Sequence, residues 1–78
     1  MYDDFNFEIV EHIATISENT TGNYAVELNK ISFNGTKPKI DLRKWNKRTG
    51  RMLKGLTLTE EEANVLYLEL KKYIERSK

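Results

Sequence analysis

Residues 30–54 read KISFNGTKPKIDLRKWNKRTGRMLK, and this stretch decides the fold. The Asn34-Gly35 pair predicts a tight turn with positive φ, and Pro38 after it is tolerated only at the start of a strand. In residues 39–46, Ile40 and Leu42 alternate with the polar side chains of Lys39, Asp41 and Arg43, which is the pattern of a β-strand. The stretch therefore predicts a turn that leads into a strand of an antiparallel sheet.

The same stretch is strongly basic. It holds nine Lys or Arg residues against a single acid, Asp41, and it also holds the aromatic residues Phe33 and Trp45. Cations bind phosphates and aromatic rings stack on unpaired bases, so this combination is typical of a surface for single-stranded nucleic acid. The net charge of the whole chain is only +1, and it hides this local concentration.

Two strands precede the basic stretch. Residues 5–17 alternate apolar and polar side chains and then change phase, which predicts a long strand with a bulge or bend. Residues 19–23 are typical of a turn, and residues 24–33 form a second alternating segment whose phase also slips. The two segments therefore predict a hairpin that bends at matched places.

A fourth strand and a helix are predicted after the strand at residues 39–46. Residues 52–58 alternate less cleanly, which is explained if Gly55 marks a bulge. Thr59 and Glu62 form a capping box, so a helix begins here. One stripe of this helix is apolar and is expected to cover the sheet; it consists of Ala63, Leu66, Tyr67, Leu70, Tyr73 and Ile74.

The predicted fold class is therefore α+β: one domain over residues 1–78, with a curved four-stranded antiparallel sheet followed by one C-terminal helix (ββββα). Along residues 39–46, Ile40 and Leu42 mark the expected core face. Trp45 falls on the opposite, outer face beside Arg43. On the helix, Val65 and Leu68 lie away from the apolar stripe, and this second apolar spot predicts a homodimer interface.

Composition excludes several functions. The chain has no Cys, so it has neither disulfides nor thiolate metal sites, and its single His12 makes a metal centre unexpected. No Gly-rich phosphate loop or activated nucleophile is present, so we expect neither an enzyme nor a cofactor. No long apolar run and no signal peptide are apparent, which predicts a cytoplasmic protein without membrane contact.

Two segments resemble a known family. Residues 38–45, PKIDLRKW, are similar to the aliphatic-Asp-aliphatic-Arg-x-aromatic strand of the positive cofactor four family of single-stranded DNA-binding transcriptional coactivators, and most of all to its short bacterial YdbC-like branch. Residues 54–62, KGLTLTEEE, resemble the strand of that family that runs into its helix. Together the two segments keep the family's order along the second half of the chain.

The resemblance implies a homodimer in which helices pack across the two-fold axis and curved sheets present grooves to single-stranded DNA. It also implies that Phe33, Arg43 and Trp45 contact that DNA.

The sequence thus predicts a single-stranded DNA-binding protein with little sequence preference and a role in transcription or DNA maintenance. Single-stranded RNA is an alternative ligand, because stacking and phosphate contacts do not separate the two sugars. An acidic protein partner docked on the basic face is another. The expected nucleic-acid-binding residues are Lys30, Phe33, Lys37, Lys39, Arg43, Trp45, Lys47, Arg51 and Lys54.

Overall fold

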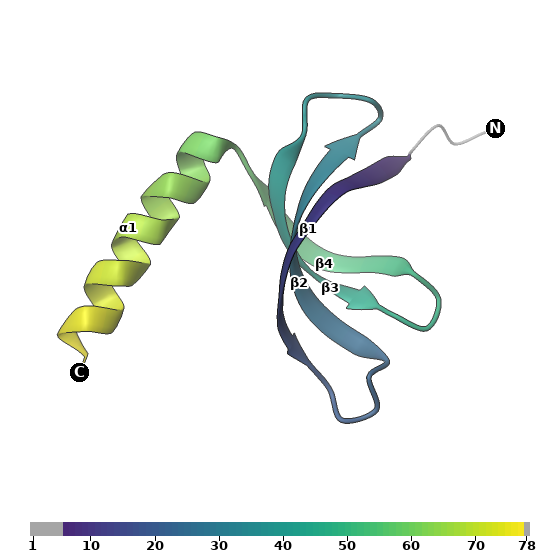
Figure 1. Cartoon of the computed structure of the whole chain (residues 1–78), viewed down its shortest axis with the longest axis horizontal. Coiled ribbons are helices and arrows are strands. Elements are labelled where there is room, and N and C mark those ends of the chain that lie inside the picture. The colour runs from purple at the N-terminus through teal and green to yellow at the C-terminus, as the bar shows by residue number, and fades with distance from the viewer. Residues whose placement is uncertain (1–5, 78) are drawn as a thin grey trace.

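The computed structural model describes residues 6–77 and has the predicted α+β architecture (Figure 1). Four antiparallel strands form one sheet in the order β1-β2-β3-β4, and a single helix follows. The expected start of the first strand at residue 5 lies outside the described residues. The elements are β1 (Phe7–Glu18), β2 (Tyr24–Phe33), β3 (Lys39–Asn46), β4 (Arg51–Leu58) and α1 (Glu60–Arg76).

The turn between β2 and β3 has the predicted geometry. Asn34 has φ 52° and Gly35 has φ 74°. Two successive positive φ values are typical of a tight hairpin turn, and Asn and Gly are the residues that adopt them most readily. The turn chemistry of the sequence therefore located this hairpin correctly.

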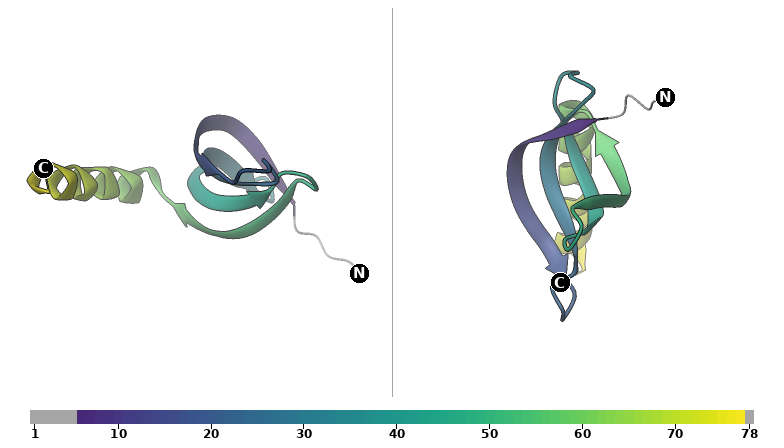
Figure 2. Two further views of the ribbon diagram at one scale, coloured as in Figure 1. Left: turned by 90° about the horizontal axis from the view of Figure 1, so that it is seen from below. Right: turned by 90° about the vertical axis from the view of Figure 1, so that its right-hand side faces the viewer.

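The edge strand β1 bends the sheet. Its pairing with β2 shifts register between Ile9 and Glu11, between His12 and Ala14, and between Thr15 and Ser17, and each time β1 holds the extra residue. Bulges add local twist, and the sheet is strongly curved (Figure 2). The phase slip expected in the second strand does not occur, because β2 pairs with β3 without interruption.

The core lies on the inner face of this curl, which is not the face predicted. The buried residues of the inner face are Ala25, Glu27, Asn29, Ile31, Asp41 and Trp45. Trp45 is only 4% exposed, so its expected place on an open outer face is wrong. Ile40 and Leu42, the expected core residues, lie half-buried on the outer face. The curvature of the sheet encloses the inner face, so its residues are buried even though several of them are polar.

Helix α1 begins as predicted but does not cover the sheet. Thr59 accepts from the Glu62 amide, and the Glu62 side chain accepts from the Thr59 amide, so the capping box is formed. No residue of α1 is buried, and the helix points away from the sheet (Figure 1). The expectation that its apolar stripe packs on its own sheet is wrong, because Thr59 is the only residue between β4 and α1 and leaves no loop for folding back. Within residues 6–77 no helix is both long and apolar enough to cross a membrane.

Candidate functional site

The antiparallel register brings distant residues together on the inner face. Glu27 on β2 lies opposite Arg43 on β3, and Arg43 lies opposite Gly55 on β4. In the neighbouring row, Asn29 lies opposite Asp41. Directly opposed residues of antiparallel strands point to the same side of the sheet. The inner face therefore carries a polar cluster across three strands.

Arg43 is fixed at the centre of this cluster. Its Nε and Nη2 donate to the two carboxylate oxygens of Asp41, each at 2.7 Å, and its Nη1 donates to the Leu53 carbonyl at 2.9 Å. Asp41 is fully buried and also accepts from the Thr57 hydroxyl at 2.9 Å. The Arg43 side chain stays 14% exposed, and a guanidinium has more N–H donors than these bonds use. Arg43 is thus held in place by three hydrogen bonds while a small part of its side chain stays exposed.

Gly55 makes room for Arg43. A Cβ at position 55 would overlap the Arg43 Cβ and lie 2.9 Å from the Arg43 Cα. The β3–β4 register also shifts at this point, between Arg43 and Trp45, so β4 is bulged as the sequence suggested. Because Gly55 has no side chain, the Arg43 side chain can lie directly against the backbone of β4.

A second ion pair lies beside the first. The Lys47 ammonium donates to Glu27 at 2.6 Å, the Asn29 amide donates to Glu27 at 3.3 Å, and Nδ1 of His12 donates to Asn29 at 2.7 Å. Burial alone raises the pKa of Glu27. The hydrogen bonds from Lys47 and Asn29, with the charges of Lys47 and His12, lower it by more, so the pKa lies below its ordinary value of 4.5. Glu27 therefore stays ionised and holds Lys47 at the margin of the inner face.

Three aromatic rings lie on the same face. The Arg43 guanidinium carbon is 6.0 Å from the centroid of the Phe33 ring. The Trp45 ring lies 5.6 Å from that of Phe7, with 55° between the planes. Phe7 belongs to β1 and Trp45 to β3, with β2 between them, so these rings meet only because the sheet curls inward. The inner face thus combines cations with aromatic surface.

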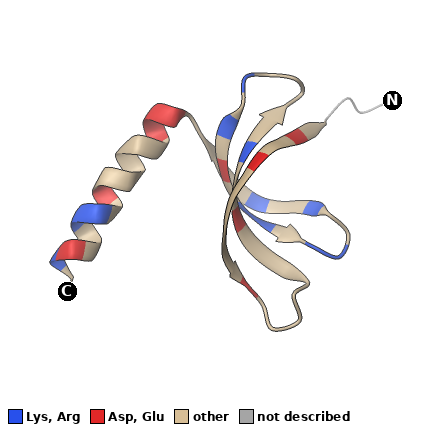
Figure 3. Cartoon of the chain, viewed as in Figure 1, with Lys and Arg blue, Asp and Glu red and all other residues tan. Residues whose placement is uncertain are grey.

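The predicted binding residues divide between the two faces. Phe33, Arg43 and Trp45 share the inner face, and Lys39 lies on it opposite Ile31. Lys30 lies on the outer face, opposite Ile40. The remaining predicted residues are exposed: Lys37 before β3, Lys47 after it, Arg51 and Lys54 on β4, and the expected interface residues Val65 and Leu68 on α1. Figure 3 shows the basic residues spread over the strands and their connecting loops.

The start of α1 brings acids close to three of these lysines. The Lys30 ammonium lies 3.8 Å from a carboxylate oxygen of Glu60. Lys37 and Lys39 line a hollow of about 340 Å³ together with Glu60 and Glu61. The helix start therefore lowers the positive potential at this end of the basic stretch.

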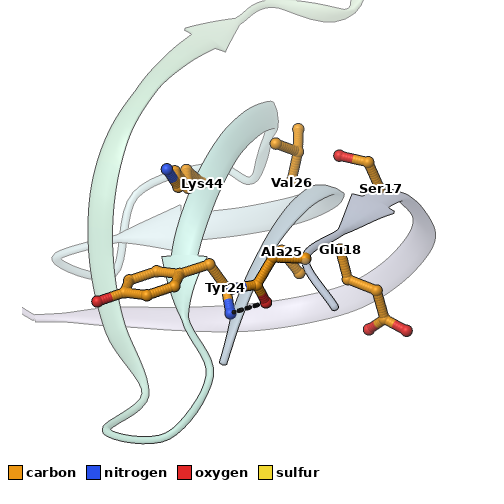
Figure 4. A pocket seen from close by; sticks show the side chains of 7 residues that line it. Ser17, Glu18, Tyr24, Ala25, Val26 and Lys44 are labelled. Atoms are coloured by element: carbon orange, nitrogen blue, oxygen red, sulfur yellow. Dashed lines mark hydrogen bonds between the residues drawn. The ribbon is translucent and has the colours of Figure 1, made fainter. Parts of the chain in front are cut away.

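A separate hollow of about 330 Å³ lies at the other end of the sheet (Figure 4). It is lined by Tyr24, Val26 and Lys44 among others, and the Lys44 ammonium lies 5.3 Å from the Tyr24 ring centroid. Val26 and Lys44 oppose each other in the register and alternate with inner-face residues, so this hollow belongs to the outer face. It is not part of the polar and aromatic cluster.

Sequence reasoning missed two members of this site. Phe7 was only one apolar residue of an alternating strand, and nothing in a linear pattern shows that it reaches Trp45 across β2. Gly55 was expected as a bulge but not as the space for Arg43. The Asp41–Arg43 pair did have a signal, because residues two apart on one strand share a face.

Comparison with known proteins gives one informative relative. No family model matches the chain. An uncharacterized protein of Treponema pallidum (strain Nichols) is 43% identical to it over 61 residues, which is 77% of this chain and 69% of the relative. The shared region is thus long enough to contain most of the sheet.

Proposed function

Because the chain belongs to the same family as this uncharacterized Treponema pallidum protein, whose name states no activity, we propose a function from the site and from the resemblance of residues 38–45 and 54–62. The protein binds single-stranded DNA with little sequence preference and acts in transcription or DNA maintenance. The proposal includes a cytoplasmic location, which suits a chain without Cys.

One observation carries the proposal: cations and aromatic rings occupy the same curved face. Phe33, Arg43 and Trp45 come from two adjacent strands and lie on one side of the sheet. The Arg43 side chain keeps 14% of its surface exposed on this face, and Lys39 and Lys47 lie at the margins. A strand of DNA running along this face meets phosphate-binding groups and stacking surfaces together, which is how single strands are held without base readout.

The proposal includes a homodimer, because large apolar surfaces are left without cover in a single chain. On the outer face, Ala14, Leu28, Leu42 and Leu56 follow one another across all four strands in register. The helix exposes Val65 and Leu68 together with all of the apolar stripe expected to cover the sheet except Ala63, which is half-buried. A second copy covers both surfaces and leaves the exposed margins of the two inner faces, where Lys39 and Lys47 lie, free to bind nucleic acid.

The test is a filter-binding titration with oligo-dT, oligo-rU and a duplex of equal length. The proposal expects tight binding of oligo-dT and weak binding of the duplex. About four phosphate contacts give a slope near −3 for log K against log salt concentration. Equal or tighter binding of oligo-rU redirects the function to RNA. Failure to bind any of the three, or a flat salt dependence, rejects the proposal and leaves an acidic protein as the ligand of the basic face.

A further inference from the structure

The polar cluster of the inner face extends to His12 on β1. The Glu27 carboxylate lies between His12 and Lys47: its Oε1 is 3.9 Å from His12 Nδ1, and its Oε2 is 2.6 Å from the Lys47 ammonium. The side chains of His12 and Lys47 are 50% and 45% exposed, whereas that of Glu27 is only 7% exposed. One buried carboxylate therefore has two accessible basic groups beside it.

The hydrogen bonds of the His12 ring show where an added proton goes. The Asn29 amide nitrogen donates to Glu27, so the Asn29 carbonyl oxygen is the atom that faces His12, and this oxygen only accepts. Nδ1 of His12 therefore already carries a hydrogen, and Nε2 is the acceptor of the neutral ring. Nε2 lies 3.4 Å from the Thr15 hydroxyl in an exposed contact. A second proton can add at Nε2 without breaking the bond to Asn29.

The charges of the two inner-face ion pairs cancel while this ring is neutral. Asp41 balances Arg43 and Glu27 balances Lys47. Glu27 keeps its charge near neutral pH, because its pKa lies below the ordinary value of 4.5. Histidine is the side chain whose ordinary pKa places its charge change between about pH 5 and about pH 8, and this chain has a single histidine. Protonation of His12 therefore gives the two pairs and the ring together a net positive charge.

We propose that protonated His12 and Lys47 together bind a phosphate of the single strand, so that affinity rises as the pH falls. While the ring is neutral, Glu27 offsets Lys47, and the pair offers a phosphate little net attraction. When the ring is charged, two cations share this carboxylate, and the surplus charge lies on half-exposed side chains. Glu11, the neighbouring acid of β1, lies opposite Lys30 on the outer face, so it faces away from this charge. The inference rests on the proposed function and adds to it a phosphate contact on β1 and a dependence on pH.

The test compares the affinity for oligo-dT at about pH 7.5 and at about pH 5.5, on either side of the ordinary histidine value. Thymine and the phosphodiester do not change charge in this range. The wild-type protein should bind about three- to tenfold more tightly at the lower pH, which is the usual scale for the effect of a nearby charge on protonation. The slope of log K against log salt concentration should also be steeper by about 0.7 there, because one more phosphate is neutralised.

Two variants separate His12 from the other charges. His12→Asn keeps an amide donor for Asn29 but cannot take up the proton, so its affinity and its salt slope should be nearly the same at both pH values. Lys44→Gln removes an exposed cation of the outer face and is the matched control, which should keep the wild-type response to pH. Nuclear magnetic resonance of the single His ring gives a readout without any variant. With oligo-dT present, the ring should take up its proton at a higher pH than in the free protein.

The outcomes distinguish this contact from the function on which it rests. If the wild-type protein binds oligo-dT at neither pH, both the function and the contact are wrong. If it binds and His12→Asn responds to pH as the wild type does, the contact alone is wrong. Tighter binding at the lower pH with an unchanged salt slope also rejects the contact, because the proton then acts through the fold and not on a phosphate. Proton uptake by the ring at the same pH with and without oligo-dT rejects it too, even if His12→Asn fails to fold.

Discussion

Arg43 contributes both to the stability of the fold, through its ion pair with Asp41, and to the proposed binding site. The fork of Arg43 neutralises a carboxylate that has no exposed surface. Removing one partner of a buried pair leaves an uncompensated charge, so Arg43→Ala should destabilise the fold by about 3–5 kcal/mol. Arg51→Ala, at an exposed position on β4, should change stability by only about 0.5 kcal/mol or less. Urea denaturation measures both, and equal midpoints for the two variants would contradict the role given to the fork.

Glu27 predicts a pH dependence of folding. Its pKa is lowered in the folded state, so its contribution to stability is fully present above its ordinary value of 4.5. This contribution is lost as the pH falls from there through the lowered pKa. The free energy of unfolding of Glu27→Gln should therefore fall less steeply than that of the wild-type protein below about pH 4.5. Urea titrations at several pH values test this, with Glu8→Gln, at an exposed carboxylate, as the control that should keep the wild-type slope.

At the scale of the element, alternation predicts which residues share a face but not which face is enclosed. Ile40 and Leu42 do share one face, and Asp41, Arg43 and Trp45 share the other, as the sequence indicates. Assigning the aliphatic face to the core failed because three bulges in β1 curl the sheet around its polar face. The carboxylates on that face, Asp41 and Glu27, are buried because they form ion pairs with Arg43 and Lys47. The hydrophobicity pattern of the sequence does not indicate that these polar residues are buried.

Boundaries were predictable where local chemistry sets them. The Asn34-Gly35 turn and the Thr59 capping box fix the ends of β2 and the start of α1 through bonds within a few residues. The position of Phe7 over Trp45 and the departure of α1 from the sheet depend on curvature and connection length. Such long-range features have no local signature, so the sequence could not reveal them.

The first turn of α1 makes a prediction about binding. Glu60 and Glu61 lie close to Lys30, Lys37 and Lys39, and their charges oppose an approaching phosphate. The double variant Glu60→Gln/Glu61→Gln should therefore bind oligo-dT severalfold more tightly at low salt, with the gain fading as salt is added. Glu69→Gln/Glu75→Gln, further along the same helix, removes equal charge and should change affinity much less. Equal gains in both variants would mean that only net charge matters.

At the scale of the whole molecule, the exposed apolar residues of α1 and of the outer face predict a second copy. Sedimentation equilibrium at micromolar concentration should give twice the mass of the 9.2 kDa chain. Leu68→Asp should shift the equilibrium towards the monomer, because it places a charge in the interface. Glu75→Asp, at another exposed position of α1, should leave the mass unchanged. A wild-type monomer, unaffected by Leu68→Asp, would show that these surfaces have another occupant.

The most direct test of the central claim is a nuclear magnetic resonance titration of isotope-labelled protein with oligo-dT. The claim is that the inner face of the curled sheet binds the single strand. The largest shifts should then come from the Phe33 and Arg43 amides and the Trp45 indole N–H, while the outer-face amides of Tyr24 and Lys44 stay in place. Large shifts at Tyr24 and Lys44, with the inner face unchanged, would contradict the account.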